Sequence, residues 1–277
     1  MRTLPILLAA LLLAAPTRPI ASPAAISPEA VVRADFEALG AGDLDRLAGL
    51  FAEDIRMYGL PSEAHTLVGR RTNQIRDRAG LRRHLEVPFA NGNVARHEVI
   101  DMLSLGELVA VRVAIHAHDD APADHALTVF RVRDGLIQAI WHVAKEAAAQ
   151  PQSGAAAKAV IQQLVEANNR GDVDAFLALF AADARNFHFR RDPERLGGGP
   201  SGSVTDQASR ERVFREMFAQ GAPVQVSTVA SVALGEWVVA RDEAVKPDGS
   251  ILDGLSIYRV RDGRIIDDWY VAEQPRQ

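Results

Sequence analysis

The sequence predicts an α+β fold that is present in two tandem copies. The chain has 277 residues, which is about the length of two average domains. Segment 30–58 recurs as segment 159–187, at an offset of 129 residues, with 12 of the 29 aligned positions identical. In each copy a helix-like periodicity comes first and a strand-like alternation follows, which is the order typical of α+β domains.

The first elements of each copy are expected to be helices. In the first copy Ser27 can cap a helix that begins at Pro28, because its hydroxyl can accept a free backbone N–H and Pro fits the first turn. Gly40 and Gly42 end this helix. Asp43 then caps a second short helix, and a third helix is expected around residues 81–90.

The other elements of each copy are expected to be strands. A short strand is expected at 55–58, and valines alternate with smaller or polar residues over 109–116, as they do again over 128–133. Asp134-Gly135 is typical of a tight hairpin turn. The sequence therefore predicts a curved antiparallel sheet that packs on three helices, twice.

The chain divides into four predicted segments. Residues 1–24 resemble a secretory signal peptide, because Arg2 precedes the apolar run Leu4–Ala15 and small residues allow cleavage after Ala24. An N-terminal membrane anchor is the alternative, although 12 apolar residues are too few to cross a bilayer. The first domain is then 27–146, the linker 147–157 and the second domain 158–274. The mature protein is expected to be exported, either periplasmic or secreted, without stable membrane insertion.

Composition excludes several classes of function. The formal charge is −5 and the sequence has no basic run, so nucleic acid is not an expected partner. The chain has no Cys, which excludes disulfides, thiolate nucleophiles and Cys-ligated metals. It also lacks the nucleophile-elbow, phosphate-loop and dinucleotide motifs. No cofactor and no metal are therefore assigned.

Two motifs, each present in both copies, carry a resemblance to a known family. The junction between the first two helices leads into LFAEDI in one copy and LFAADA in the other, and both copies later contain RVRDG followed by Trp. This pattern resembles the nuclear transport factor 2-like superfamily, most closely its SnoaL-like branch of polyketide cyclases, which is related to ketosteroid isomerases. The resemblance implies two cone-shaped domains, each with a central pocket. It does not fix a reaction, because isomerases, dehydratases, cyclases, epoxide hydrolases and adaptors share this fold.

The chain departs from the catalytic pattern of that family at two places. Isomerase-like members carry a carboxylate base five residues after the Asp that ends the helix motif, and here Gly59 and His188 stand at that position. SnoaL-like members often carry an Asp three residues after the late Trp, and here Ala144 and Ala272 stand there. The second copy therefore offers an imidazole where the first offers no base.

His188 is the predicted general base, because an imidazole can move protons near neutral pH. On a strand it shares a face with Asn186, a candidate ligand-binding residue. Arg241 and Tyr270 are the candidates for stabilising a developing oxyanion. A water-facing His188 on an edge strand is the structural alternative.

Several further residues are candidates for ligand binding. Arg112 occupies the same repeat position as Arg241, and Glu243 is a possible ion-pair partner of Arg241; a structural ion pair is the other interpretation. His116 ends a strand with His118, in a pattern that favours a solvated strand end over a zinc site. The remaining candidates are Tyr58 and His142.

His142 matches Tyr270 beside the shared Trp of each repeat. Neighbouring residues of a strand face opposite ways, so either the Trp is core and His142 and Tyr270 line the pocket, or the reverse. We expect the pockets to be lined by the side chains that face away from the aliphatic valines.

The sequence favours a cofactor-independent enzyme that moves a proton on a small apolar, carbonyl-bearing molecule, as an isomerase, cyclase or dehydratase would. The second copy is the expected active one. The alternative is a non-catalytic module that binds a small molecule or a protein. The two copies could also pair with each other through their sheets, as an internal pseudo-dimer.

Overall fold

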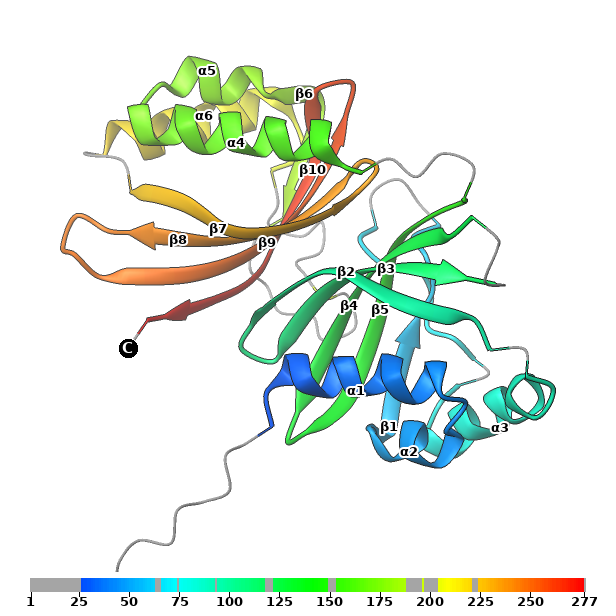
Figure 1. Ribbon diagram of the computed structural model, residues 1–277. Helices are drawn as coiled ribbons and strands as arrows, with labels where there is room; N and C mark the ends of the chain where they lie inside the picture. The colour runs from blue at the N-terminus through cyan, green and yellow to red at the C-terminus, as the bar shows by residue number, and fades with distance from the viewer. Residues whose placement is uncertain are drawn as a thin grey trace, which may run out of the picture.

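The computed structural model describes residues 26–62, 66–73, 75–92, 94–117, 122–148, 153–187, 196, 204–220 and 224–276. These residues form two α+β copies in tandem, each a five-stranded sheet with three helices, which confirms the predicted fold class (Figure 1). The predicted signal peptide lies outside the described residues. No helix in the described part of the chain is both long and apolar enough to span a membrane.

The first two helices of the first copy begin where the sequence places them, whereas the third begins at Arg78, three residues before the expected start. Ser27 caps α1, with its Oγ 3.2 Å from the Ala30 backbone nitrogen, and Asp43 caps α2 in the same way. The elements of this copy, in order, are α1 (Pro28–Gly40), α2 (Leu44–Gly49), β1 (Phe51–Tyr58), α3 (Arg78–Ala90), β2 (Arg96–Leu105), β3 (Leu108–His116), β4 (Asp124–Arg133) and β5 (Leu136–Glu146).

The second copy repeats this order. Its elements are α4 (Ala155–Arg170), α5 (Val173–Ala178), β6 (Phe180–Phe187), α6 (Gln207–Ala219), β7 (Gln225–Leu234), β8 (Trp237–Val245), β9 (Ile251–Arg261) and β10 (Arg264–Pro275). Helix α4 begins inside the range that the sequence assigns to the linker, because the Ala residues there continue the helix in the N-terminal direction.

Each sheet is antiparallel except at one edge. The strand orders are β1-β5-β4-β3-β2 and β6-β10-β9-β8-β7. The edge strand that follows the first two helices, β1 or β6, runs parallel to the last strand of its copy, so both sheets are mixed. Strand-like alternation cannot reveal this direction, because it is the same in parallel and antiparallel strands.

The two sheets lie between two layers of helices (Figure 1). Helices α1, α2 and α3 cover one side of the first sheet, and helices α4, α5 and α6 cover the outer side of the second. We call the region between the helices and the helix-facing side of each sheet the first cup and the second cup. Valines at alternate positions of the third strand of each copy, such as Val109 and Val238, face the helices.

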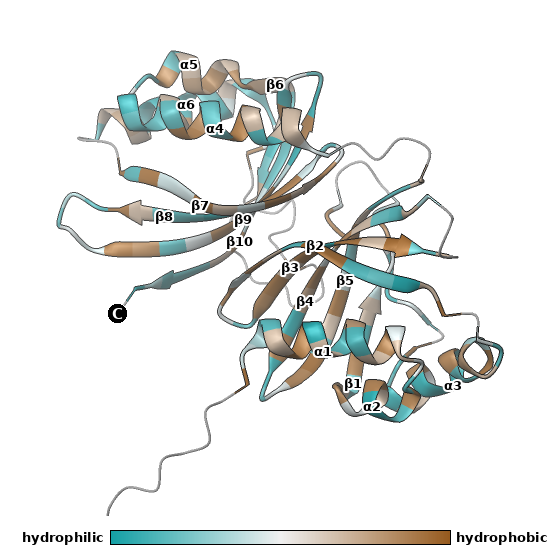
Figure 2. Ribbon diagram, viewed as in Figure 1, coloured by the Kyte–Doolittle hydropathy of each residue, from teal (hydrophilic) through white to brown (hydrophobic). Residues whose placement is uncertain are grey.

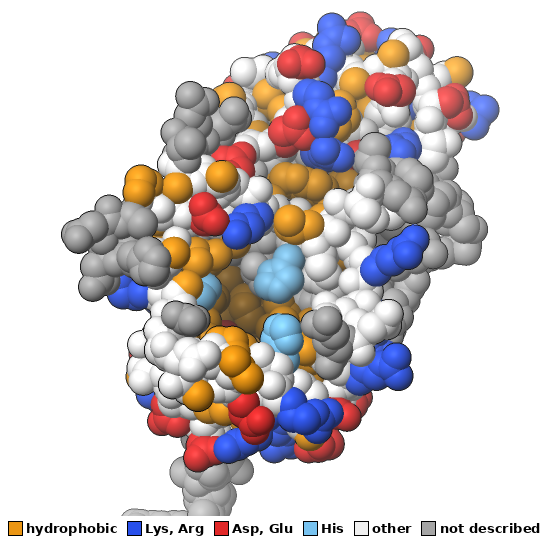
Figure 3. Space-filling model, turned by 90° about the vertical axis from the view of Figure 1, so that its right-hand side faces the viewer, with side chains coloured by type: hydrophobic (Ala, Val, Ile, Leu, Met, Phe, Trp, Pro, Cys, Tyr) orange, Lys and Arg blue, Asp and Glu red, His pale blue; other side chains and the backbone are white. Residues whose placement is uncertain are grey.

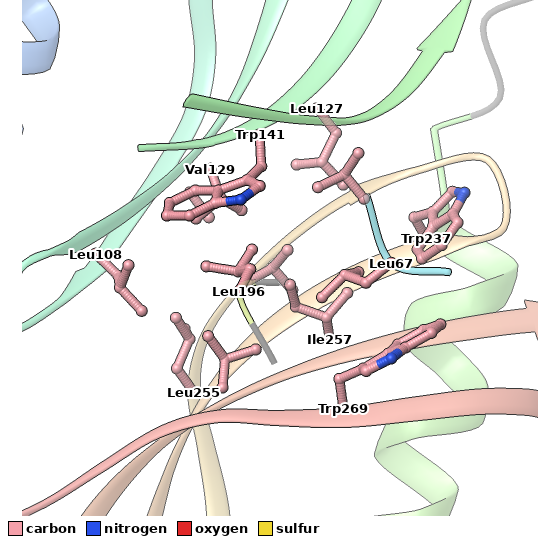
Figure 4. Close-up of a cluster of buried hydrophobic side chains, with 14 of the residues drawn as sticks. Leu67, Leu108, Leu127, Val129, Trp141, Leu196, Trp237, Leu255, Ile257 and Trp269 are labelled. Carbon is pink, nitrogen blue, oxygen red and sulfur yellow. The ribbon is translucent and has the colours of Figure 1, made fainter. Parts of the chain in front are cut away.

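The other faces of the two sheets meet in one hydrophobic cluster (Figure 4). Trp141 of the first copy and Trp269 of the second are almost fully buried there. Trp269 stacks on Phe187 at 5.1 Å between ring centroids and on Trp237 at 5.7 Å. Figure 2 shows hydrophobic residues along the strands of both sheets, because each sheet buries both of its faces.

The connection between the copies is closely packed at Gly154, which precedes α4. Its φ is +71°, and a Cβ added there would lie 2.5 Å from the Cβ of Ala233. We expect Gly154→Ala to lower the free energy of unfolding by about 2–4 kcal/mol, the sum of left-handed strain and overpacking. Gly249→Ala is the control, because Gly249 has φ +80° and open space around it, so only the strain applies. Equal losses in thermal denaturation would contradict the contact with Ala233.

Candidate functional site

The first cup contains a cavity of about 480 Å³. Figure 3 looks into a hollow with hydrophobic walls and His side chains at its edges. Helices α1, α2 and α3 and the strands of the first sheet contribute its wall. Its lining residues include Asp35, Phe36, His84, His97, Val113 and His142.

The wall of this cavity corrects the predicted orientation of the sheet. Val113 and Ile115 line it, so the cavity lies on the aliphatic side of β3 and not on the opposite side. The prediction was wrong because both faces of the sheet are buried. Alternation separates two faces of a strand but does not say which one a helix covers.

Asp35 is a buried carboxyl in the wall of the cavity. It lies on the apolar face of α1 with Val31, Val32 and Ala38, and only 6% of the residue is exposed. No hydrogen bond or ion pair joins its carboxyl to any other residue that the structure describes. Burial in these surroundings disfavours the charged form and raises the pKa of Asp35 to about 7.

Histidines supply the other titratable groups of the first cup. His97 stacks on Phe36 at 5.7 Å between ring centroids, and its Nδ1 lies 2.9 Å from the Ala95 carbonyl oxygen. His142 has its Nδ1 3.3 Å from the hydroxyl of Thr128. Burial lowers the pKa of both imidazoles below the usual value, so both are neutral at pH 7. His84, on α3, is exposed.

This arrangement combines one acid that titrates near neutral pH with neutral imidazoles in an apolar space. A carboxyl with a pKa near 7 can accept or return a proton under physiological conditions. A neutral imidazole can donate a hydrogen bond to a carbonyl oxygen. The lining is otherwise mostly hydrophobic, which fits a small apolar ligand.

The same positions of the second copy carry different groups. Asp35 corresponds to Leu164, and His97 corresponds to Val226, at the offset of 129 residues. In the last two strands of each copy the offset is 128, which matches His142 with Tyr270. The cross-strand pairs Thr128–His142 and Ser256–Tyr270 agree with this alignment. The two cups therefore have the same frame and different chemistry.

Arg112, Arg241 and Glu243 lie on the face of the sheets opposite the helices. Arg241 lies on the same face of β8 as Val239, which belongs to the cluster between the two sheets, and its Nη1 lies 3.2 Å from the carbonyl oxygen of Ser104 in the first copy. Its ion pair is with Asp253, at 3.6 Å, and not with Glu243 as predicted.

The other members of that group also have structural partners. Glu243 instead binds Arg276, which directly follows β10. Arg112 has its Nη1 3.9 Å from Asp101. None of the three arginine and glutamate side chains, Arg112, Arg241 and Glu243, belongs to the lining of the first-cup cavity.

Two further candidates of the first copy lie outside its cavity. Tyr58 is buried in the cluster between the sheets, where its ring stacks on Trp141 at 5.7 Å. His116 lies at the end of β3, with its Nε2 3.6 Å from Glu98. Of the two orientations that the sequence allows for the Trp of each repeat, the first copy has the one in which Trp141 is core and His142 lines the cavity.

Of the remaining candidates of the second copy, the structure describes Asn186 and Tyr270 but not His188. His188 lies outside the described residues, so its predicted role as a base stays a prediction. Asn186 lies on β6, opposite Phe187, which faces the cluster between the sheets. Tyr270 lies on β10 and alternates in the same way with Trp269. Asn186 and Tyr270 therefore belong to the second cup.

Asp35 is the candidate functional residue that sequence reasoning missed. It interrupts an apolar helix face at a position where the other copy carries Leu164. A carboxyl on the buried face of a helix destabilises the fold unless it has a partner, so an unpartnered one is a candidate for a functional role. A position-by-position comparison of the two copies could have identified Asp35, because it shows where one copy has a polar residue and the other an apolar one.

Comparison with known families agrees with the fold and the repeat. The model of the SnoaL-like domain matches residues 32–140 and again residues 161–267, which together are most of the chain. The chain belongs to the SnoaL-like domain family. The resemblance expected from the sequence motifs is therefore confirmed in both copies of this SnoaL-like protein. No curated protein matches the chain.

Three solved structures that this SnoaL-like protein resembles each correspond to less than half of its length. Wild-type IdmH from Streptomyces antibioticus, provisionally described as a polyketide cyclase, is 28% identical over 42% of this chain and 91% of its own, with a TM-score of 0.32. A Kribbella flavida protein, provisionally described as a ketosteroid isomerase, is 21% identical over 44% of this chain and 83% of its own, with a TM-score of 0.32. An NTF2-like protein of unknown function from Mesorhizobium loti is 14% identical over 46% and 98%, with a TM-score of 0.36.

Proposed function

We propose that the first cup catalyses proton transfer on a small apolar, carbonyl-bearing molecule, with Asp35 as the base. The observation that carries this proposal is the Asp35 carboxyl, which lies in the wall of an apolar cavity without a partner among the described residues. The proposal places the reaction in the first copy, whereas sequence reasoning favours the second.

The proposed proton transfer needs no reactant other than the substrate and the protein's own side chains. The Asp35 carboxylate takes a proton from a carbon next to the carbonyl, so the C–H bond breaks and its electron pair forms an enolate. His142 donates a hydrogen bond to the oxygen on which the charge develops. The carboxylic acid form of Asp35 then returns the proton to the same or a different carbon, which yields exchange or isomerisation.

The size and lining of the cavity support this class of substrate. A volume of about 480 Å³ lies within the range of cavities that hold small organic ligands. Its mostly hydrophobic wall offers few groups that could solvate the buried Asp35 carboxylate, which keeps that carboxylate basic.

Exchange of α-protons in D₂O tests the proposal. The probe is 2-tetralone, an apolar cyclic ketone, and ¹H NMR follows the loss of its α-proton signals. We expect the wild-type protein to accelerate this exchange at least about 100-fold more than Asp35→Asn does, because a positioned base contributes that much. The rate should rise with pH and level off above about pH 7, as the carboxylate forms.

Glu37→Gln is the matched control, because Glu37 lies on the same helix with 64% of its side chain exposed, and it should exchange like the wild type. Equal exchange by wild type and Asp35→Asn would refute the assigned base. Binding of the ketone without exchange would favour the alternative function, a non-catalytic binding module.

A further inference from the structure

The second cup contains a buried pair of polar side chains that the proposed function does not use. Asn186 and Asp268 are neighbours across the parallel strands β6 and β10, and the Asn186 amide nitrogen donates to the Asp268 carboxylate at 2.8 Å. The two residues are only 2% and 1% exposed. The second oxygen of each, Asn186 Oδ1 and Asp268 Oδ1, is buried and has no hydrogen-bond partner among the residues that the structure describes.

Two unmatched buried acceptors side by side are unusual. A buried acceptor without a donor costs about 1–3 kcal/mol, so native structures keep few of them. In the first copy the corresponding positions are Met57 and Ile140, which need no donor. The frame of the fold therefore does not require a polar pair here.

A second carboxyl and two tyrosines belong to the same cup. Asp242 continues the helix-facing row of β8 after Ala240, and the Thr228 hydroxyl donates to it at 2.6 Å. The pKa values of Tyr258 and Tyr270 are raised by burial first and then by the nearby charges of Asp242 and Asp268. The four side chains therefore lie within electrostatic reach of one another.

Among the residues that the structure describes, Arg210 is the cation whose charge acts on Asp268. Arg210 of α6 is buried, and it donates to the backbone carbonyl oxygens of Ala181, Ala182 and Ala184 on β6. Arg185 and Asp267 pair with each other on the other face of the sheet, at 2.7 Å. The donors of Arg210 are thus held by the backbone, and burial raises the pKa of Asp268 to about 7 and also raises the pKa of Asp242.

We propose that the second cup is a separate binding site for a small organic ammonium ion. Its N–H groups would donate to the free oxygens of Asn186 and Asp268, and its positive charge would favour the carboxylate form of Asp268 over the protonated form. Tyr258 and Tyr270 would contribute the electron-rich ring faces that attract ammonium groups. This site does not depend on the reaction proposed for the first cup.

Calorimetric titration of the whole protein with benzylamine tests the proposal. Benzyl alcohol is the neutral probe of nearly the same shape. We expect benzylamine to bind with a dissociation constant of about 1 mM or below, and the alcohol to bind at least about ten-fold more weakly. Asp268→Asn and Asp242→Asn should each weaken the binding of benzylamine about ten-fold or more, because each removes a charge and keeps the shape.

Asp35→Asn is the matched control, since it removes the buried carboxyl of the other cup. Its affinity for benzylamine should equal that of the wild type. Equal affinities for amine and alcohol, or no binding of benzylamine, would overturn the proposal. So would a loss of binding in Asp35→Asn that Asp268→Asn does not share, since the amine would then occupy the first cup. Failure of 2-tetralone exchange would leave this result unaffected.

Discussion

Asp35→Leu is expected to make the protein more stable and to abolish the exchange of 2-tetralone. The substitution copies Leu164, which the second copy carries at the same position. It removes a buried carboxyl without a described partner and fills part of the apolar cavity with a side chain that suits it. Gain of stability with loss of activity is the pattern expected when a destabilising residue is kept for function.

The size of the gain depends on pH. The folded protein holds the Asp35 proton up to about pH 7, whereas the unfolded chain loses it near the ordinary pKa of 3.8. Stability therefore falls as the pH rises through this window, and the full cost is present above it. The difference between the two pKa values corresponds to about 4 kcal/mol. Asp35→Leu should recover about this amount at pH 8 and much less at pH 4.

Chemical denaturation of wild type and variant at both pH values measures this difference. Glu37→Leu, on the exposed face of the same helix, should show no comparable gain at pH 8. If Asp35→Leu is less stable than the wild type at pH 8, the carboxylate has a stabilising partner and the proposed base is wrong.

Trp269→Ala is expected to lower the free energy of unfolding by about 3–5 kcal/mol, the usual cost of emptying a large buried aromatic site. Trp269 is 2% exposed and joins the cluster formed by both sheets. Because each sheet covers the other's inner face, the variant should also loosen the two copies from each other. We expect one calorimetric transition in the wild type and two in the variant.

Phe176→Ala provides the comparison, because Phe176 is equally part of a core but packs between the helices and the second sheet. It should destabilise the second copy and leave the face between the sheets intact. A single, merely shifted transition for Trp269→Ala would show that the sheet–sheet contact does not hold the copies together.

The repeated motifs were sufficient to predict the fold. Caps such as Ser27 and Asp43 act through local hydrogen bonds, so a short stretch of sequence contains all that determines them. The α+β order and the duplication depend on periodicity and similarity, which the sequence displays directly. The parallel edge of each sheet could not be predicted, because it depends on where the chain returns after the helices.

The site was harder to predict because it depends on which face of each strand the helices cover. Arg112 and Arg241 were chosen as pocket residues because they alternate with valines, and the alternation is real. Both faces are nevertheless apolar, one against helices and one against the other sheet, so the sequence pattern has two equivalent interpretations. Asp35 escaped notice because one carboxyl hardly changes the amphipathic pattern of a helix.

The short covalent connection through Gly154 has an evolutionary consequence. In an assembly of two identical chains every substitution appears at both symmetry-related positions, so neither site can change alone. In a single chain that contains both halves, a carboxyl can appear in one half while its counterpart becomes leucine. Each half can then acquire a specialised role, while the other half preserves the shared architecture.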